Sequence, residues 1–516
     1  MLAKTYGSTV SGVDASLITI EVNITQGKGV FMVGLPDSAI KESEHRIESA
    51  IKYLSYRMPR HKTIVNMAPA DVKKEGSSFD LPIALGILQA SEQVVSSHLK
   101  DYLILGELSL DGLLRPIKGA LPIAIEARQQ GFKGFILPKE NAEEAAVVND
   151  LDIIPVESLA QAILFCEDPT SIEPLVRDTR DLFYYNLNNY DADFSDVQGH
   201  ESVKRALEVA AAGGHNIIMV GPPGSGKTML ARRLPTILPP LSLNEALETT
   251  KIYSVVGKLD KTKGLIAMRP FAAPHHTTSD VALVGGGNIP QPGQISLAHN
   301  GILFLDELPE FKRTVLEVLR QPLEERKVTI SRARASVEFP ANFMLVASMN
   351  PSPSGDFYRA DGTHPDSLMS VQKYLSKVSG PLLDRIDIHI EVNPVSFEKI
   401  TSDKKNEKSE TIRTRVINAR NIQEKRFKNL ELSESIYSNA MMPPKVTKDI
   451  CQLDQVSKTL LKTAIERLGL SSRAYDRILK VSRTIADLEG SDNIQAQHIA
   501  EAIQYRSLDR EGWGSK

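Results

Sequence analysis

The fold is decided by residues 217–228, which read IIMVGPPGSGKT. The apolar run at 217–220 predicts a short buried strand, and a glycine-rich loop and the start of a helix follow it directly. Glycines in such a loop let backbone N–H groups converge on phosphate oxygens, and the helix adds its positive N-terminal end. A chance glycine-rich turn before a helix is the alternative, and the filled fixed positions of the motif argue against it.

Two side chains of this loop have predictable roles at a bound triphosphate. Lys227 is expected to reach the β- and γ-phosphates, and the Thr228 hydroxyl is expected to ligate Mg²⁺. The whole predicted ATP-binding set is Gly221, Pro222, Pro223, Gly224, Ser225, Gly226, Lys227 and Thr228. The sequence therefore predicts ATP and Mg²⁺ as the cofactors of an α/β fold.

A second apolar run, at 301–305, ends in the carboxylate pair Asp306 and Glu307. Ligands collect at the carboxyl ends of strands in open α/β sheets. We expect Asp306 to hold the metal through water and Glu307 to polarise the water that attacks the γ-phosphate. Alone, the pair could be a solvated strand end. After a phosphate-binding loop, it predicts ATP hydrolysis.

Three further polar residues are candidates for the same site. Asn350 follows a third apolar strand, where its amide could bond the γ-phosphate or the attacking water, although asparagine there is more often a turn former. Arg385 is the candidate for a guanidinium supplied to a neighbouring subunit, and a surface ion cluster with Asp384 and Asp387 is the alternative. Arg473 opens a serine-capped helix and could fold over the nucleotide, although a solvated arginine would look similar.

Composition excludes several classes of protein. The chain has 516 residues with 41% hydrophobic residues, 24% charged residues and a net charge of −3, so any contact with nucleic acid must come from a local patch. Cys166 and Cys451 cannot form a disulfide framework, and their small number suits a reducing cytosol. No apolar run approaches the ~20 residues of a membrane span. Residues 1–8 have no secretory pattern. We expect a cytoplasmic protein without a membrane partner.

Changes in composition and in the periodicity of apolar residues divide the chain into five parts. Residues 1–166 predict one compact α/β unit, and 167–195 lose periodicity as a connector does. Residues 196–400 alternate strands and helices, which predicts a parallel, doubly wound sheet. The polar stretch at 401–411 predicts a linker, and 412–516 have helical periodicity almost throughout. Within the first unit we expect strands at 17–22, 64–67, 102–105, 135–137 and 153–156, and helices at 38–53, 81–89 and 123–128.

Along nearly its whole length the chain resembles the bacterial YifB/ComM family, in the magnesium-chelatase-like branch of AAA+ ATPases. The resemblance is carried by the phosphate loop and by residues 196–199, 273–280, 293–299, 303–310 and 382–387. It implies a central AAA+ αβα sandwich with a C-terminal helical lid, in a hexameric homo-oligomeric ring that acts on DNA. Members of the ComM type are branch-migration helicases in natural transformation. By this resemblance Asn350, Arg385 and Arg473 fall on the sensor-1, finger and sensor-2 positions.

The sequence departs from the family's pattern at a metal site. Many relatives carry four cysteines after sensor 1, whereas this chain has Ser352, Ser354, Ser367 and Met369 at those places. Without thiolate ligands no zinc site is expected, so Mg²⁺ is the only predicted metal. The neighbouring histidines His275 and His276 have no third ligand at a suitable spacing, and we expect them to be structural.

The N-terminal unit resembles the Lon-protease-like fold of the ribosomal protein S5 domain 2 type, on residues 74–81 and 106–109. A Ser–Lys peptidase needs a nucleophile and a lysine that takes its proton. Ser78 falls near the nucleophile position, but Leu121 stands at the lysine position and Lys118 is displaced by three residues. We therefore expect a non-proteolytic domain that binds DNA or organises the ring.

A β-hairpin is expected at residues 325–337, between the second and third strands of the sheet. Hairpins at this place in related motors project into the central pore. Lys327, Arg332 and Arg334 could neutralise phosphates there without reading sequence, although polar residues on a hairpin are usually only solvated.

Three functions fit these patterns. The first is a motor that moves branched or single-stranded DNA. The second is a chelatase-type motor that remodels a protein partner, and the Lon-like domain argues against it, because chelatase motor subunits are expected to lack that domain. The third is a scaffold that switches with nucleotide, and the intact Glu307 argues against it.

Overall fold

The computed structural model describes residues 2–74, 76–180, 183, 190, 192–260, 264–287, 290–332, 335–355, 368–400, 406–428, 430 and 436–506. The chain forms two compact units. The first contains residues 1–187 and 242–267, and the second contains residues 188–241 and 268–516. The chain therefore leaves the second unit after residue 241 and returns to it at residue 268.

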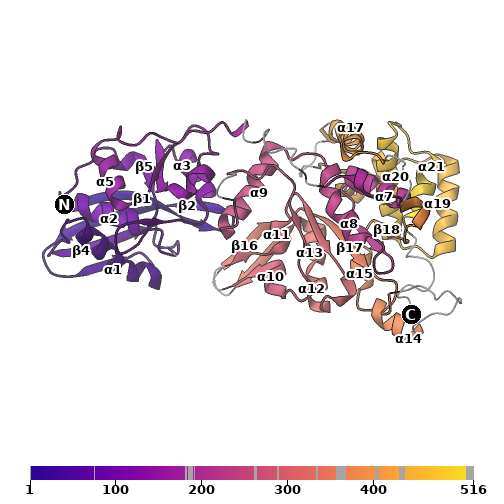
Figure 1. Cartoon of the computed structure of the whole chain (residues 1–516), viewed down its shortest axis with the longest axis horizontal. Coiled ribbons are helices and arrows are strands. Elements are labelled where there is room, and N and C mark those ends of the chain that lie inside the picture. Colours follow the sequence, from indigo (N-terminus) through magenta and orange to yellow (C-terminus); the bar gives the residue numbers. More distant parts are fainter. Residues whose placement is uncertain are drawn as a thin grey trace. The chain divides into compact units, whose positions relative to one another are not determined.

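The first unit is built on a seven-stranded mixed sheet in the order β3-β4-β2-β1-β5-β8-β9 (Figure 1). Its strands are β1 (Leu2–Ser11), β2 (Asp14–Thr25), β3 (Val30–Val33), β4 (Lys62–Ala68), β5 (Tyr102–Ile104), β8 (Gly134–Pro138) and β9 (Asp152–Val156). β1 and β2 form an antiparallel hairpin, whereas β5, β8 and β9 pair in parallel. Alternate residues of β2 (Ile18, Ile20 and Val22) are fully buried, as the apolar alternation predicts. A short hairpin, β6 (Glu107–Leu108) and β7 (Leu114–Arg115), completes the strands.

Helices complete the described part of this unit. They are α1 (Ser38–Tyr53), α2 (Asp80–Ala90), α3 (Ala120–Gln129), α4 (Ala142–Ala145), α5 (Leu159–Glu167) and α9 (Leu243–Val256). Asp37 caps α1 by accepting a hydrogen bond from the Ile40 amide at 2.9 Å. α2 packs on β1, β2 and α1 and buries almost every side chain, which explains why its sequence is apolar all round.

Helix α9 belongs to the first unit although it lies within the predicted ATPase core at 196–400. The Gly119 amide donates to the Ser254 carbonyl oxygen at 3.1 Å. The Ser254 hydroxyl bonds the carboxylate of Glu144, whose pKa is raised by burial. Lys251 pairs with Asp14 at 3.2 Å. These contacts attach a segment between two strands of the second unit's sheet to the N-terminal fold.

The second unit is built on a five-stranded parallel sheet in the order β11-β14-β17-β10-β18. Its strands are β11 (Phe271–Ala272), β14 (Ile302–Leu305), β17 (Met344–Met349), β10 (Ile217–Val220) and β18 (Ile388–Glu391). Ile217 of β10 lies opposite Val346 on one side and Ile388 on the other. All residues of β10, β14 and β17 are buried, as expected for strands covered on both faces. The predicted doubly wound α/β sandwich is confirmed.

Shorter elements surround this sheet. The helices of the core are α7 (Glu201–Gly213), α8 (Lys227–Arg233), α10 (Asp280–Val284), α11 (Gln294–Leu297), α12 (Arg313–Val318), α13 (Arg320–Glu325), α14 (Leu368–Leu375), α15 (Gly380–Leu383) and α16 (Phe397–Ile400). The second unit also contains two hairpins, β12 (Gly285–Gly286) with β13 (Gln291–Pro292) and β15 (Lys327–Arg332) with β16 (Ala335–Pro340). The second hairpin lies where the sequence predicts one.

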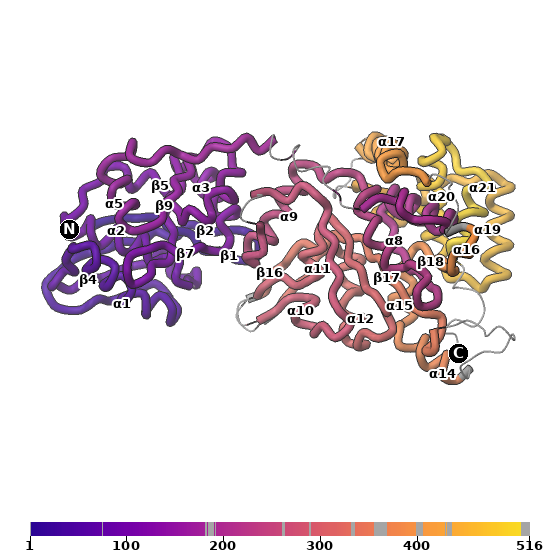
Figure 2. The backbone as a smooth tube through the Cα atoms, viewed as in Figure 1, coloured from indigo at the N-terminus to yellow at the C-terminus, as the bar shows by residue number. Residues whose placement is uncertain are grey.

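The predicted C-terminal helical domain is also confirmed (Figure 2). It contains α17 (Ser409–Lys428), α18 (Pro444–Ile450), α19 (Gln455–Leu468), α20 (Ser472–Leu488) and α21 (Ala496–Gln504). α17 and α20 pack against α7 of the core. No helix among the described residues is both long and apolar enough to cross a membrane.

A buried polar junction joins α20 to the end of the sheet. Asp387 accepts from Arg477 at 2.6 Å and contacts His215 at 3.0 Å, and His215 also contacts Thr484 at 2.8 Å. Burial lowers the pKa of His215, against the opposing effect of Asp387. Burial alone would raise the pKa of Asp387, but Arg477 and His215 lower it below its usual range. The carboxylate is therefore ionised and fully paired.

Replacement of this carboxylate is expected to destabilise the second unit. Asp387→Asn leaves Arg477 without its charged partner at a buried position, and should lower the free energy of unfolding by about 3 kcal/mol. Asp384→Asn is the matched control. Its contact with Arg473 is exposed, so the expected loss is below about 1 kcal/mol. Urea unfolding followed by circular dichroism measures both, and equal losses would contradict the assignment.

The two cysteines are expected to be unreactive in the native protein. Cys166 and Cys451 are buried, and burial raises the pKa of each thiol to about 12. At pH 8 a disulfide reagent should therefore titrate less than about one thiol within minutes, and both thiols once the chain is unfolded in guanidinium. Rapid titration of either thiol in the folded protein would show that the surrounding core opens.

Candidate functional site

The predicted phosphate loop leaves β10 at the carboxyl end of the sheet and enters α8. The Gly221 amide donates to the Met349 carbonyl oxygen at 3.2 Å, which fixes the start of the loop beside the end of β17. A Cβ atom at Gly221 would overlap the carbonyl oxygen of Val392, so only glycine fits. Gly226 caps α8 with a φ of 88°, in the left-handed region that favours glycine.

Lys227 points into this loop. Its Nζ atom donates to the carbonyl oxygens of Gly221 at 2.6 Å and Pro222 at 2.9 Å, and to Asn350 Oδ1 at 3.2 Å. Lys227 is buried, and burial lowers the pKa of its amino group while Asp306 and Glu307 oppose the shift. The structure thus brings together the loop lysine and the amide that the sequence places after β17.

Thr228 and Asp306 meet on the other side of the loop. The Thr228 hydroxyl donates to Asp306 Oδ2 at 2.7 Å, and the buried Ser348 hydroxyl bonds Asp306 Oδ1. A hydroxyl and a carboxylate are the hard oxygen donors that Mg²⁺ prefers. The hydroxyl of Ser225 is buried and has no hydrogen-bond partner among the described residues. These donors fit a magnesium-bound triphosphate.

Glu307 has an unusual backbone conformation. Its φ of 54° lies in the left-handed region, which is uncommon for a residue other than glycine and often marks a functional site. The Glu307 amide lies 3.4 Å from Ser348 Oγ, and the side chain is 54% exposed. His276 Nδ1 lies 3.7 Å from Glu307 Oε2. His276, which the sequence predicts to be structural, therefore lies against the candidate catalytic carboxylate.

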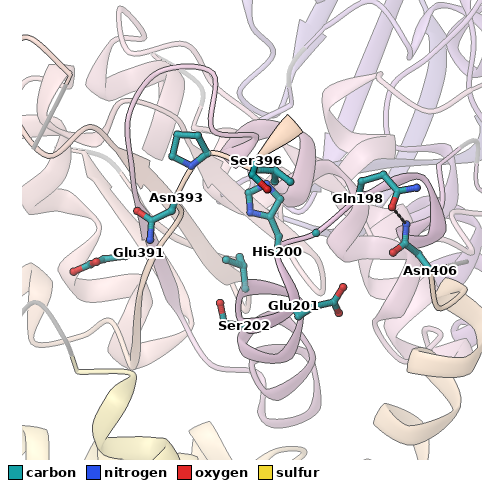
Figure 3. Close-up of a pocket in the computed structure, with 12 residues that line it drawn as sticks. Gln198, His200, Glu201, Ser202, Glu391, Asn393, Ser396 and Asn406 are labelled. Carbon is teal, nitrogen blue, oxygen red and sulfur yellow. Dashed lines mark hydrogen bonds between the residues drawn. The ribbon is translucent and has the colours of Figure 1, made fainter. Parts of the chain in front are cut away.

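A pocket of about 480 Å³ opens beside the phosphate loop and was not predicted (Figure 3). Its walls come from the segment before α7 and from the end of β18, and include Gln198, His200 and Asn393. Asn406 closes one side by donating to Gln198 at 2.9 Å, shown as a dashed line in Figure 3. His200 Nε2 lies 3.5 Å from the position of a Cβ atom at Gly226, so pocket and loop are adjacent. Its volume is typical of small-ligand sites, and it suits a nucleoside.

The two candidate arginines meet the segment that precedes β18. Arg473 lies 3.3 Å from Asp384, and its side chain is 60% exposed. Arg385 is buried, with its guanidinium against Glu324 at 2.5 Å. The alternative, a surface ion cluster of Arg385 with Asp384 and Asp387, does not form. Asp384 and Asp387 pair with arginines of α20 instead.

The candidate DNA-binding residues are only partly described. Lys327 pairs with Glu338 across the hairpin at 2.9 Å. The backbone of Arg332 ends β15, but its side chain and all of Arg334 lie outside the described residues. At the places where relatives carry cysteines, Ser352 and Ser354 hydroxyls lie 3.0 Å apart, Met369 is exposed and Ser367 is outside the described residues.

In the first unit, Leu121 is fully buried in the core at the position that a Ser–Lys peptidase would fill with a lysine. Ser78 lies at the start of the turn before α2, where its carbonyl oxygen accepts from the Gly106 amide at 2.7 Å. Lys118 is exposed at the edge of a small pocket shared with Glu144 and Ser254. The non-proteolytic assignment stays a prediction.

Three family models match the chain. Magnesium chelatase, subunit ChlI, matches residues 193–400. Subunit ChlI of Mg-chelatase matches residues 20–141, and the ChlI C-terminal model matches residues 406–506. A model with the chelatase name thus covers most of the Lon-like unit, which weakens the sequence-based objection to a chelatase-type motor.

Two bacterial relatives match nearly the full length of the chain, and a third matches part of it. The competence protein ComM of Haemophilus influenzae is 45% identical over 99% of this chain and 98% of its own. The YifB protein of Escherichia coli is 43% identical over 97% and 96%. Lon protease 2 of Bacillus subtilis is 31% identical over 31% of this chain and 33% of its own, which supports the Lon-like similarity. The chain therefore belongs to the YifB/ComM family of magnesium-chelatase-like AAA+ ATPases.

Proposed function

We propose that the chain is an ATP-hydrolysing ring motor that moves branched DNA. The observation that carries the ATPase part is the convergence of Thr228 on Asp306 and of Lys227 on Asn350 at one edge of the parallel sheet. Three strand ends and a phosphate loop thereby surround one point with donors for a triphosphate and a metal.

Each residue has a separate task in this proposal. Lys227 and the loop amides bind the phosphates, and the pocket beside His200 takes the nucleoside. Mg²⁺, when bound at Thr228 and Asp306, neutralises phosphate charge. Glu307 orients the attacking water and takes its proton, and Asn350 positions that water or the γ-phosphate. His276 lies close enough to Glu307 to hold its carboxylate in place.

Arg385 and Arg473 complete the site in the assembled protein. Arg385 would enter the site of a neighbouring subunit and stabilise the charge of the transition state. Arg473, on the first turn of α20, would report nucleotide to the lid. This arrangement requires a homo-oligomer, and family resemblance favours a hexameric ring.

DNA is the proposed substrate for two reasons. The relative from Haemophilus influenzae is named a competence protein, and the family resemblance implies that members of the ComM type act on DNA in natural transformation. The hairpin β15–β16 carries three basic residues, and a pore hairpin that contacts phosphates needs no sequence recognition. A cytoplasmic setting accompanies this function.

A chelatase-type motor is the second candidate, since models named for the magnesium chelatase subunit cover three parts of the chain. It would use the same nucleotide site to remodel a protein partner. The two candidates differ in one property, because only the DNA motor should hydrolyse ATP faster on branched DNA, and less so as salt rises.

Glu307→Gln is expected to uncouple binding from turnover. The variant should bind ATP and DNA like the wild type, but hydrolyse ATP at least about 100-fold more slowly, since the general base is lost. It should also fail to migrate a synthetic four-way junction. Lys227→Ala should lose ATP binding, and Glu310→Gln, an exposed residue paired with Lys377, should behave like the wild type. Equal migration by Glu307→Gln and the wild type would remove Glu307 from this role.

Replacement of both Arg332 and Arg334 by alanine should weaken DNA binding whatever its sequence. Each lost phosphate contact reduces the slope of log affinity against log salt concentration by about one, so we expect a reduction of about two. Fluorescence anisotropy with a labelled junction at several salt concentrations measures this slope. Replacement of Lys458 and Lys462 on α19 is the control for a lost surface charge. An unchanged slope in the hairpin variant would favour the protein-remodelling function.

A further inference from the structure

The guanidinium of Arg385 is already bound to a carboxylate within its own subunit. Arg385 Nη2 lies 2.5 Å from Glu324 Oε1, and Nη1 donates to the Pro381 carbonyl oxygen at 2.6 Å. The Arg385 side chain is 8% exposed and the Glu324 side chain 56% exposed. The carboxylate therefore lies on the solvent side of the pair, between the guanidinium and any anion that approaches from outside.

The pairing leaves one donor of this guanidinium unused. Arg385 Nε is buried and has no hydrogen-bond partner among the described residues. A buried donor without a partner costs free energy, so an arrangement that satisfies all of the guanidinium would be preferred. A phosphate group offers several acceptor oxygens in the fork geometry that arginine matches. The site is thus suited to exchange one anion for another.

Glu324 lies at the base of the candidate DNA-binding hairpin. It is in the last turn of α13, and a single residue, Arg326, separates α13 from β15. Arg326 has a φ of 56°, its amide donates to the Pro322 carbonyl oxygen at 3.0 Å, and its carbonyl oxygen accepts from the Ala341 amide at 2.8 Å. Both ends of the hairpin are therefore tied to the end of α13. Because no long flexible linker separates the hairpin from α13, a displacement of the hairpin should also move Glu324.

We propose that Glu324 restrains Arg385 in cis and competes with the triphosphate bound by the adjacent subunit. This inference rests on the proposed function, in which Arg385 acts across a subunit interface. DNA that displaces the hairpin moves α13, separates the carboxylate from the guanidinium and frees Arg385 to act. Glu324 is in these terms a positioning residue, and the pair couples DNA contact in one subunit to hydrolysis in the next.

The exchange of Glu324 for phosphate is feasible because the positive charge of the Arg385 guanidinium has an anionic partner in both states. In one state Arg385 pairs with a carboxylate, and in the other it pairs with phosphate oxygens. Two arrangements that each satisfy the charge can lie close in free energy, so a modest force on the hairpin can shift their populations. The Glu324 side chain is 56% exposed, so water screens its charge and keeps the strength of the pair within the range that such a shift can overcome.

The test uses the full-length assembled protein and Glu324→Gln. Without DNA, this variant should hydrolyse ATP about fivefold faster than the wild type, because the competing charge is removed. Its stimulation by a synthetic four-way junction should fall by the same factor. The gain should be in kcat with KM unchanged, a split that a merely structural role would not produce. Glu325→Gln, the same change one residue along α13, is the matched control and should behave like the wild type.

Two further variants separate this inference from the proposed function. Arg385→Ala should be inactive, and the double variant Glu324→Gln/Arg385→Ala should be equally inactive. A wild-type rate and wild-type DNA stimulation in Glu324→Gln, beside an inactive Arg385→Ala, would overturn the role of Glu324 alone. Full activity of Arg385→Ala would overturn the finger itself. Sedimentation velocity of each variant establishes that the compared assemblies have the same size.

Discussion

The hydrogen bond between Thr228 and Asp306 depends on parallel strands whose carboxyl ends lie at the same edge of the sheet. Thr228 follows β10 through the phosphate loop, and Asp306 follows β14, which is separated from β10 by β17. The bond forms because all three strands run parallel and in register, so that their carboxyl ends share one edge. A slip of one residue in β14 would turn the carboxylate to the other face of the sheet. The buried apolar strands thus set the register on which every polar contact of the site depends.

Sequence patterns predicted the parts of this arrangement that are local. The predicted helix at 38–53 coincides with α1, because its cap and its apolar spacing are both contained in neighbouring residues. The phosphate loop and Asp306 were found for the same reason. β1 was not predicted, since Lys4, Thr5 and other polar residues interrupt its apolar pattern, and partners from β2 and β5 complete it. Residues whose contacts are made with partners far away in the sequence have no local pattern that predicts those contacts.

Sequence patterns do not predict contacts between residues that are far apart in the chain. Three features of this structure depend on such contacts: His276, Glu324 and the pocket beside His200. His276 follows β11 and Glu307 follows β14, and only the pairing of these strands brings the two side chains together. The pocket forms between residues that are almost two hundred positions apart in the chain. Helix α9 has a capping box and ordinary helical residues, which predict a helix but do not say against which sheet it packs. Its attachment to Gly119 and Glu144 is a property of the assembled fold.

The segment before β18 is bound on two sides by ion pairs of different exposure. On the lid side, Arg473 and Arg477 are four residues apart on α20 and pair with Asp384 and Asp387. This spacing places both arginines on one face of the helix, so lid and segment must move together or separate at both points. The pair with Asp387 is buried and costly to break, whereas the pair with Asp384 is exposed. On the hairpin side, Arg385 pairs with the half-exposed carboxylate of Glu324, its one carboxylate partner among the described residues. The segment is therefore bound more strongly to the lid than to the hairpin. Release of Arg385 by motion of the hairpin costs less free energy than release by motion of the lid.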